Sequence, residues 1–112
     1  MRLTDLEPQF LAVSAPGHWR HVDTLAEAQG ILFLCPKCFA ENGGPVGTHA
    51  VVCWSADRGT PTEERPLPGR WALKGTGYAD LTLDGEGGKS RSVLLTGPGC
   101  GWHGFVTNGE IS

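Results

Sequence analysis

Two closely spaced pairs of metal-ligating residue types stand out in this 112-residue sequence. Cys35 and Cys38 form the first pair in Cys-Pro-Lys-Cys, and Cys100 and His103 form the second in Cys-Gly-Trp-His. A two-residue spacing lets both side chains of a pair turn toward one tetrahedral ion, and three thiolates with one imidazole suit zinc better than magnesium or calcium. The pattern predicts a Zn²⁺ site formed by Cys35, Cys38, Cys100 and His103.

The residues around these ligands favour tight turns. Pro36 fixes one φ angle of the first turn, and Gly99 and Gly101 flank Cys100 in the second. In such turns backbone N–H groups point at the first sulfur and help to hold it as a thiolate. Lys37 adds a positive charge beside a site whose net charge with Zn²⁺ would be −1.

Other chemistries remain open for these cysteines. Cys35 and Cys38 could form a redox pair, although a thioredoxin-like motif needs a βαβ setting, or they could be unrelated thiols. If a metal binds, four protein ligands favour a structural role, because a catalytic zinc keeps an open position and a nearby carboxylate. Glu41 is the nearest such carboxylate in sequence, and we expect it to be solvated.

His49 and Cys53 form a second, weaker constellation. Four residues apart on a strand they would lie about 13 Å from each other, too far to share one ion. Cys53 fits the core best. We favour a His49 side chain bonded to backbone, with replacement of a ligand or a hydrogen bond to a thiolate as the alternative. A reactive Cys53 with His49 as base would instead make a thiol enzyme.

Four tryptophans are many for this length, and most are expected in the core. Trp102 differs because it lies between two predicted ligands. It is either an exposed contact for a partner or a lid over the metal site. The cluster of residues 18–21, His-Trp-Arg-His, is expected to be a surface loop.

The predicted fold class is mostly β: a small single-domain antiparallel sheet over residues 1–112, with two zinc-knuckle turns, zinc-ribbon-like, and one short helix. We expect that helix over residues 24–29, capped by Asp23 and ended by Gly30. An edge strand near residues 2–6 would precede an irregular segment to residue 22, which Pro8 and Pro16 interrupt. Residues 40–47, with Gly43, Gly44, Pro45 and Gly47, are expected to form a loop. Further strands are expected at residues 31–34, 50–55, 71–73 and 105–107, the last followed by a turn at Asn108-Gly109. Residues 81–83 and 92–95 are expected to form a hairpin around a turn at 84–88.

Composition excludes several classes of protein. With 17 Gly and 8 Pro the chain does not fit a helical bundle, and residues 57–70 are expected to form an exposed loop. The net charge of −3 is scattered, so we do not expect nucleic acid as a partner, although Arg58, Arg65 and Arg70 could form a local basic patch. No apolar run approaches a bilayer span, and the first residues carry acids and no apolar signal core, so we expect a cytoplasmic protein without membrane contact.

The chain also resembles a known family at several points along its length. They are Leu-x-Pro-x-Phe at residues 6–10, Gly-Ile-Leu-Phe-Leu at 30–34, Trp71-x-Leu73, Leu81-Thr-Leu83, Ser92-Val93 and the terminal Cys-x-x-His-x-Phe. The pattern is similar to a small uncharacterised family of zinc-binding proteins from phages, prophages and bacterial mobile elements, some encoded near ubiquitin-like conjugation genes. The resemblance implies Cys35, Cys38, Cys100 and His103 as metal ligands and implies no activity.

The function that follows is a structural-zinc binding or adaptor module with a protein partner. Four ligands without catalytic accompaniment favour it over an enzyme. A zinc- or thiol-dependent enzyme is the first alternative, and a nucleic-acid-binding zinc ribbon is the second.

Overall fold

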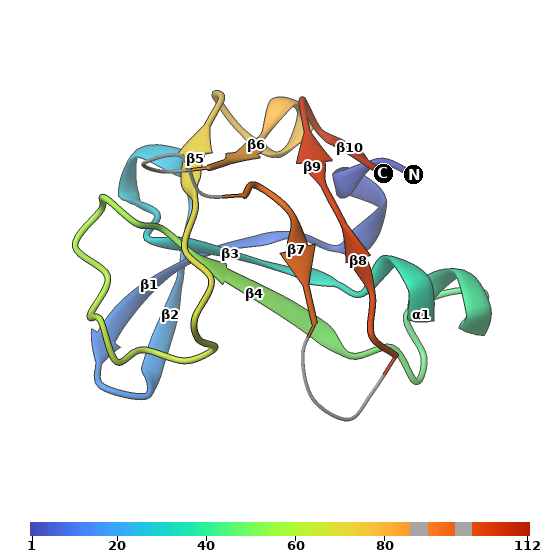
Figure 1. Ribbon diagram of the computed structural model, residues 1–112, viewed down its shortest axis with the longest axis horizontal. Coiled ribbons are helices and arrows are strands. Elements are labelled where there is room, and N and C mark those ends of the chain that lie inside the picture. Colours follow the sequence, from blue (N-terminus) through green and yellow to red (C-terminus); the bar gives the residue numbers. More distant parts are fainter. Residues whose placement is uncertain (86–89, 96–99) are drawn as a thin grey trace.

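A four-stranded antiparallel sheet with strand order β2-β1-β3-β4 crosses the molecule (Figure 1). The computed structural model describes residues 1–85, 90–95 and 100–112. The strands of the sheet are β1 (Gln9–Ala15), β2 (His18–Val22), β3 (Gly30–Leu34) and β4 (Ala50–Trp54). The predicted mostly β class, with antiparallel sheets and one short α-helix among the described residues, is confirmed.

The N-terminal third is more regular than the sequence suggested. Residues 9–22, predicted to be irregular, form the β1–β2 hairpin, in which Phe10 pairs with Val22. Pro16 does not break this structure because it lies in the connecting turn, followed by Gly17 at φ +77°. Proline is common at the first central position of a type II turn, and the positive φ of the second favours glycine.

Two short 3-10 helices replace other expected elements. Residues Leu3–Leu6 form η1 where an edge strand was predicted, because Leu3 and Leu6, three apart, share one face and are both fully buried. The predicted helix over residues 24–29 is reduced to η2 (Leu25–Glu27). Gly30 does not end it in a left-handed conformation. Gly30 instead begins β3, where the ring of Trp54 leaves no room for a Cβ atom.

The helix of the structure is α1 (Pro36–Asn42), in a segment that was predicted to be a turn and a loop. Pro36 suits the first helical turn because the missing N–H would be unpaired there in any case. Gly43 ends the helix at φ +69°. The glycines that suggested a loop therefore mark the end of the helix.

Short strand pairs pack above the sheet in Figure 1. They are β5 (Ala72–Lys74) with β6 (Thr82–Asp84), β7 (Val93–Leu94) with β8 (His103–Gly104), and β9 (Val106–Thr107) with β10 (Glu110–Ile111), and η3 (Tyr78–Asp80) precedes β6. The predicted hairpin of residues 81–83 with 92–95 is wrong, since β6 pairs with β5 and β7 with β8. Of its predicted turn, residues 86–88 lie outside the described residues, as does Gly99 beside Cys100.

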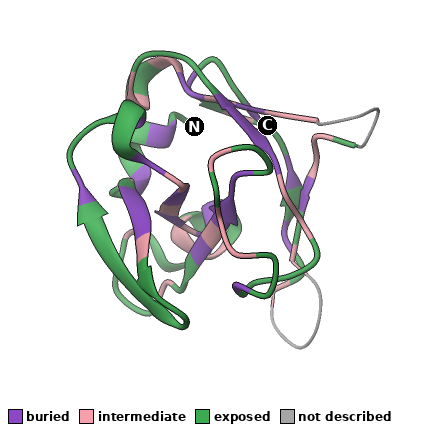
Figure 2. Cartoon of the chain, turned by 90° about the vertical axis from the view of Figure 1, so that its left-hand side faces the viewer, coloured by how far each residue is buried: buried purple, intermediate pink, exposed green. Residues whose placement is uncertain are grey.

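The hydrophobic core lies between the sheet and these strand pairs (Figure 2). Phe10, Ile31, Phe33, Leu83 and Val106 are among its most buried members. The N- and C-terminal segments meet beside it, where Arg2 bridges to Glu110. Within the described part of the chain, no helix has the length and apolarity needed to cross a membrane.

Residues 57–70 contain no helix or strand, as predicted, but polar side chains hold them to the body of the protein. Arg58 donates to the carbonyls of Leu25 and Ala28, and Arg70 to that of Glu64. The predicted basic patch is therefore not formed as expected: two of its three arginines bind the protein's own carbonyl groups, and Arg65 alone of the three is exposed.

Candidate metal centre

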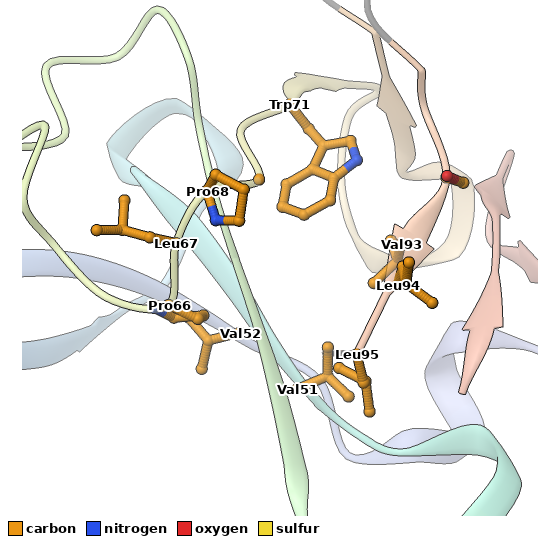
Figure 3. A pocket seen from close by; sticks show the side chains of 11 residues that line it. Val51, Val52, Pro66, Leu67, Pro68, Trp71, Val93, Leu94 and Leu95 are labelled. Carbon is orange, nitrogen blue, oxygen red and sulfur yellow. The ribbon is translucent and has the colours of Figure 1, made fainter. Parts of the chain in front are cut away.

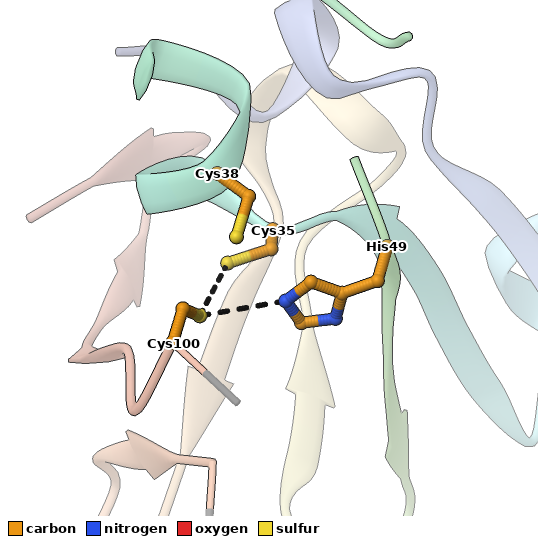
Figure 4. A group of neighbouring side chains, drawn as sticks. All are labelled: Cys35, Cys38, His49 and Cys100. Carbon is orange, nitrogen blue, oxygen red and sulfur yellow. Dashed lines mark hydrogen bonds between the residues drawn. The ribbon is translucent and has the colours of Figure 1, made fainter. Parts of the chain in front are cut away.

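Three thiols and one imidazole meet where β3 runs into α1 (Figure 4). They belong to Cys35, Cys38, Cys100 and His49, and their ligand atoms all lie within 4.8 Å of one another. The Sγ of Cys100 is 3.4 Å from the Sγ of Cys35 and 3.4 Å from Nε2 of His49. The four side chains lie close enough to hold one metal ion.

The pairing of β3 with β4 brings Cys35 and His49 together. Leu34 pairs with Ala50 in this antiparallel ladder, and the N–H of Cys35 donates to the carbonyl of His49 at 2.8 Å, so the register continues by one more pair. Residues directly opposite each other in an antiparallel ladder project to the same side with Cβ atoms about 4.5–5.5 Å apart. The register alone thus delivers two of the four donors.

Helix α1 supplies the third donor. Cys38 lies in the first turn of the helix, three residues after Cys35, and its thiol faces the other three donors (Figure 4). The backbone N–H groups of Lys37 and Cys38 hydrogen-bond to the sulfur of Cys35. This is the arrangement expected for a turn that holds a thiolate, and it is formed by the protein alone.

Cys100 comes from a distant part of the sequence. It immediately precedes the β8 side of the β7–β8 pair, whose ladder extends to a hydrogen bond from Leu95 to Trp102. The Nζ atom of Lys37 donates to the carbonyl oxygen of Cys100 at 2.8 Å and so connects α1 to this segment. The positive charge predicted for Lys37 is therefore beside the cluster.

Hydrogen bonds and burial affect the three thiols differently. Burial raises the pKa of Cys35, and it raises the pKa of Cys38 to about 12. The hydrogen bond from His49, with a second from the N–H of Trp102, lowers the pKa of Cys100 to about 6. Cys100 is thus the thiolate of the cluster at neutral pH. A metal bound by all three sulfurs must displace the protons of Cys35 and Cys38.

His103, the predicted fourth ligand, lies outside this four-donor group among the described residues. It begins β8 opposite Leu94, and its exposed ring is 6.4 Å from that of Phe105. Successive side chains of a strand alternate between faces, so the neighbouring Trp102 points inward and His103 outward. The interpretation of residues 100–103 as one knuckle with two ligands assumed a turn where the structure has the start of a strand.

His49 takes the place that His103 was expected to fill, as in the alternative left open above. The distance from His49 to Cys53 along β4 does not reveal this role, because the residue that His49 meets is Cys35 on the neighbouring strand. The signal was available in the sequence: two apolar strands adjacent in the chain, ending at Leu34 and beginning at Ala50, form an antiparallel pair most simply. Such a pair places the residues after the first strand beside those before the second.

Trp102 is not a surface contact. It is 8% exposed and packs edge-on against Phe33, with ring centroids 6.1 Å apart. It therefore anchors the β7–β8 segment in the core directly behind Cys100. Among the other tryptophans, Trp19 is 40% exposed, with its Nε1 bonded to Glu64, and Trp54 and Trp71 are buried.

Cys53 and Glu41, the nucleophile and the carboxylate that an enzyme would have used, do not belong to the cluster. Cys53 is fully buried, as the core interpretation predicted, and burial raises its pKa, which does not suit a nucleophile paired with His49. Glu41 is exposed on α1, and within the described residues no carboxylate belongs to the four-donor group.

No family model, curated protein or solved structure matches this chain. The chemistry of the cluster therefore has to be argued from its own geometry. Three segments, the β3–α1 junction, the start of β4 and the approach to β8, converge on one point with four donors of the types that bind borderline-soft metal ions.

Proposed function

We propose that this protein is a zinc-stabilised binding module, in which one Zn²⁺ ion is held by Cys35, Cys38, Cys100 and His49. The observation that carries the proposal is the convergence of these four donors within 4.8 Å from three separate segments of the chain. Three sulfurs and one imidazole nitrogen form one of the common ligand sets of structural zinc.

The spacing of the donors fits a tetrahedral zinc ion. With Zn–S bonds of about 2.3 Å and a Zn–N bond of about 2.0 Å, the edges of the tetrahedron are about 3.8 Å between sulfurs and about 3.5 Å from nitrogen to sulfur. The two measured separations from Cys100, 3.4 Å to Cys35 and 3.4 Å to His49, lie close to these values. Small shifts of side chains would complete the tetrahedron.

A structural role follows from where the ligands lie. A closed set of four protein ligands leaves zinc no position for a substrate, and the ion would tie residues 35–38 to residue 49 and to residue 100. Many elements here are strands of two or three residues, which bury little surface by themselves. In small domains of this kind bound metal supplies folding free energy, about 10–16 kcal/mol in apparent terms for zinc-finger peptides.

Because a closed zinc site offers no position for a substrate, the domain acts by binding another protein, as an adaptor. Zinc at this site neutralises most of the thiolate charge and leaves the surface of the domain free for contacts. Four cysteines without a disulfide among them suit a reducing compartment such as the cytoplasm.

Metal analysis of the purified full chain tests the proposal. We expect one zinc per chain by elemental mass spectrometry. Replacement by Co²⁺ should give the visible bands of a tetrahedral site, with sulfur-to-metal charge transfer of an intensity matching three thiolates. A chain that folds fully without metal and gains no thermal stability when zinc is added would refute the proposal.

A further inference from the structure

A groove of about 280 Å³ lies between β4, β7 and residues 66–69 (Figure 3). Val51 and Val52 line it from β4, Leu94 and Leu95 from the β7 side, and Leu67 and Trp71 from the segment that follows the long loop. None of the described residues lining it is charged. Leu67 and Leu94 remain about half exposed, at 45% and 54%.

The groove runs along strand edges and not across a sheet face. Consecutive residues of a strand point to opposite faces, so a depression over one face would be lined by alternate residues. Here two consecutive residues of β4 and three consecutive residues at β7, Val93 to Leu95, line the same groove. Such lining is possible only beside the edge of each strand.

The edge of β4 beside the groove is only partly hydrogen-bonded among residues 1–85, 90–95 and 100–112. In the β3–β4 ladder, Cys35 bonds to His49 and Ser55 to Gln29, so the odd-numbered residues of β4 direct their backbone groups toward β3 and the even-numbered ones away from it. Trp71 uses this outer edge at one end, donating to the carbonyl of Trp54 at 3.1 Å.

Beyond that bond, no backbone hydrogen bond joins residues 66–70 to this edge among the described residues. The next outward residue, Val52, has no partner on this side among the described residues.

The edge of β7 repeats this feature. Leu95 donates to Trp102 across the β7–β8 ladder, so Val93 and Leu95 direct their backbone groups toward β8. Leu94 between them directs its N–H and carbonyl away from β8, and no residue of the described part of the chain bonds to them. Within the described part of the chain, two strand edges without backbone partners therefore border one apolar groove.

We propose that this groove binds an extended apolar segment of a partner protein, which adds as a strand to the open edges at Val52 and Leu94. Backbone hydrogen bonds would supply affinity, and alternate apolar side chains of the segment would fill the space beside Val51 and Trp71. This inference identifies the partner of the module and so rests on the proposed function.

The open backbone groups decide between occupants. A small apolar molecule would fill the groove but leave the N–H and carbonyl of Val52 and Leu94 without partners. A nucleic acid would meet no positive charge on the lining. An extended peptide satisfies both the apolar walls and the strand edges.

Two donors of the candidate metal centre lie next to the strands that form the walls of the groove. His49 immediately precedes β4, and Cys100 lies on the connection that joins β7 to β8. An ion bound by both residues ties one wall to the other. Segment binding is therefore expected to need the metal, although no ligand of the metal lines the groove.

Selection from a display library of random twelve-residue peptides against the zinc-loaded full chain tests the proposal. We expect enriched peptides with alternating apolar residues. Their affinity should fall at least about tenfold for Leu94→Lys, which places a charge in the groove, and stay unchanged for the matched control Val46→Lys, which is 87% exposed outside it.

Backbone pairing is tested separately with N-methylated versions of an enriched peptide. A strand bonded to an edge uses every second amide, so methylation of one alternate set should abolish binding and methylation of the other set should preserve it. Equal effects of the two sets would show that no strand is added. Val52→Pro, which removes one edge N–H, should weaken binding if this variant folds.

The proposal would be overturned if no peptide is enriched, or if enriched peptides bind Leu94→Lys as well as they bind the unmodified chain. It would also be overturned if the chain forms a dimer that Leu94→Lys dissociates, because the occupant of the groove would then be a second copy of this chain. Zinc content, measured on the same samples, separates this proposal from the proposed function. A chain with one zinc and no peptide binding refutes the groove alone. A chain that binds no zinc but still binds peptides refutes the metal site and the expected need for metal, and leaves the groove in place.

Discussion

Cys35 and His49 lie directly opposite each other across the β3–β4 ladder, joined by a backbone hydrogen bond of 2.8 Å from Cys35 to His49. The candidate metal centre is therefore an extension of the sheet: the last ladder pair supplies two of the four donors, and α1 and Cys100 before β8 bring one each. Any change that shifts this register by one residue would leave the two side chains on opposite faces of the sheet.

Substitution of the two histidines distinguishes the candidate ligands. His49→Ala should lower zinc affinity by at least about tenfold, because it removes one of four ligands and the hydrogen bond to Cys100. His103→Ala, the matched control, should keep one zinc per chain, since its ring faces solvent beside Phe105. Competition with a coloured chelator measures both affinities. Loss of zinc from His103→Ala alone would restore the original ligand prediction.

The cysteines divide into ligands and a core residue. Cys100→Ser should lose zinc and unfold at much lower temperature or aggregate, because the metal no longer ties the β7–β8 segment to α1. Cys53→Ser should retain the metal and lose about 1–3 kcal/mol of unfolding free energy, the cost of burying a hydroxyl in an apolar site. Elemental analysis and thermal melts check both variants. A zinc-free Cys53→Ser protein would contradict the assignment.

Glu64 holds the long loop against the β1–β2 hairpin. Glu64 is 5% exposed, and its carboxylate accepts the Nε1–H of Trp19 at 2.8 Å and the N–H of Gly17. Glu64→Ala should cost about 1–3 kcal/mol of unfolding free energy, because these donors lose their acceptor.

Acrylamide quenching of Trp19 fluorescence should increase in the same variant, and denaturant unfolding measures the stability. Glu63→Ala is the control, since the exposed Glu63 bonds only to the neighbouring Thr62 among the described residues, and it should change neither quantity. Equal effects of the two substitutions would argue against this anchor.

Asp80 gives the fold a dependence on pH. The backbone N–H groups of Thr76 and Gly77, with the hydroxyl of Thr76, stabilise its carboxylate and lower its pKa below the ordinary 3.8. A lowered pKa in the folded state contributes stability above the pKa of the unfolded state, and this contribution disappears as the pH falls through the folded value.

Asp80→Asn should therefore be less stable than the unmodified protein at neutral pH, and the difference should shrink as the pH falls below 3.8. Denaturant unfolding of both proteins at each pH measures it, and loss of bound metal in acid affects both alike. A difference that stays constant with pH would show that Asp80 acts without its charge.

The local elements that formed as predicted have strong signals of their own. The apolar run at residues 31–34 and the strand predicted at 50–55 from its valines and tryptophan fold as β3 and β4, and Asn108-Gly109 turns β9 into β10 with both residues at positive φ. Predictions from proline and glycine were wrong where these residues occur both in irregular segments and at the turns or ends of regular elements. Pro16 and Gly43 indicated irregular structure, but one lies in a hairpin turn and the other ends a helix.

Residue types and turn chemistry were enough to identify Cys35, Cys38 and Cys100 as the thiols that meet, to place Cys53 in the core and to indicate a mostly β fold. The choice between His49 and His103 was made by the tertiary structure. Both histidines lie near a cysteine in the sequence, but a ligand must point at the ion as well as lie near it. Strand register turns His49 toward Cys35, and the alternation of β8 turns His103 to solvent. The open edges of β4 and β7 could not be predicted from the sequence either, because the pairing of strands depends on the assembled sheet and not on any one segment.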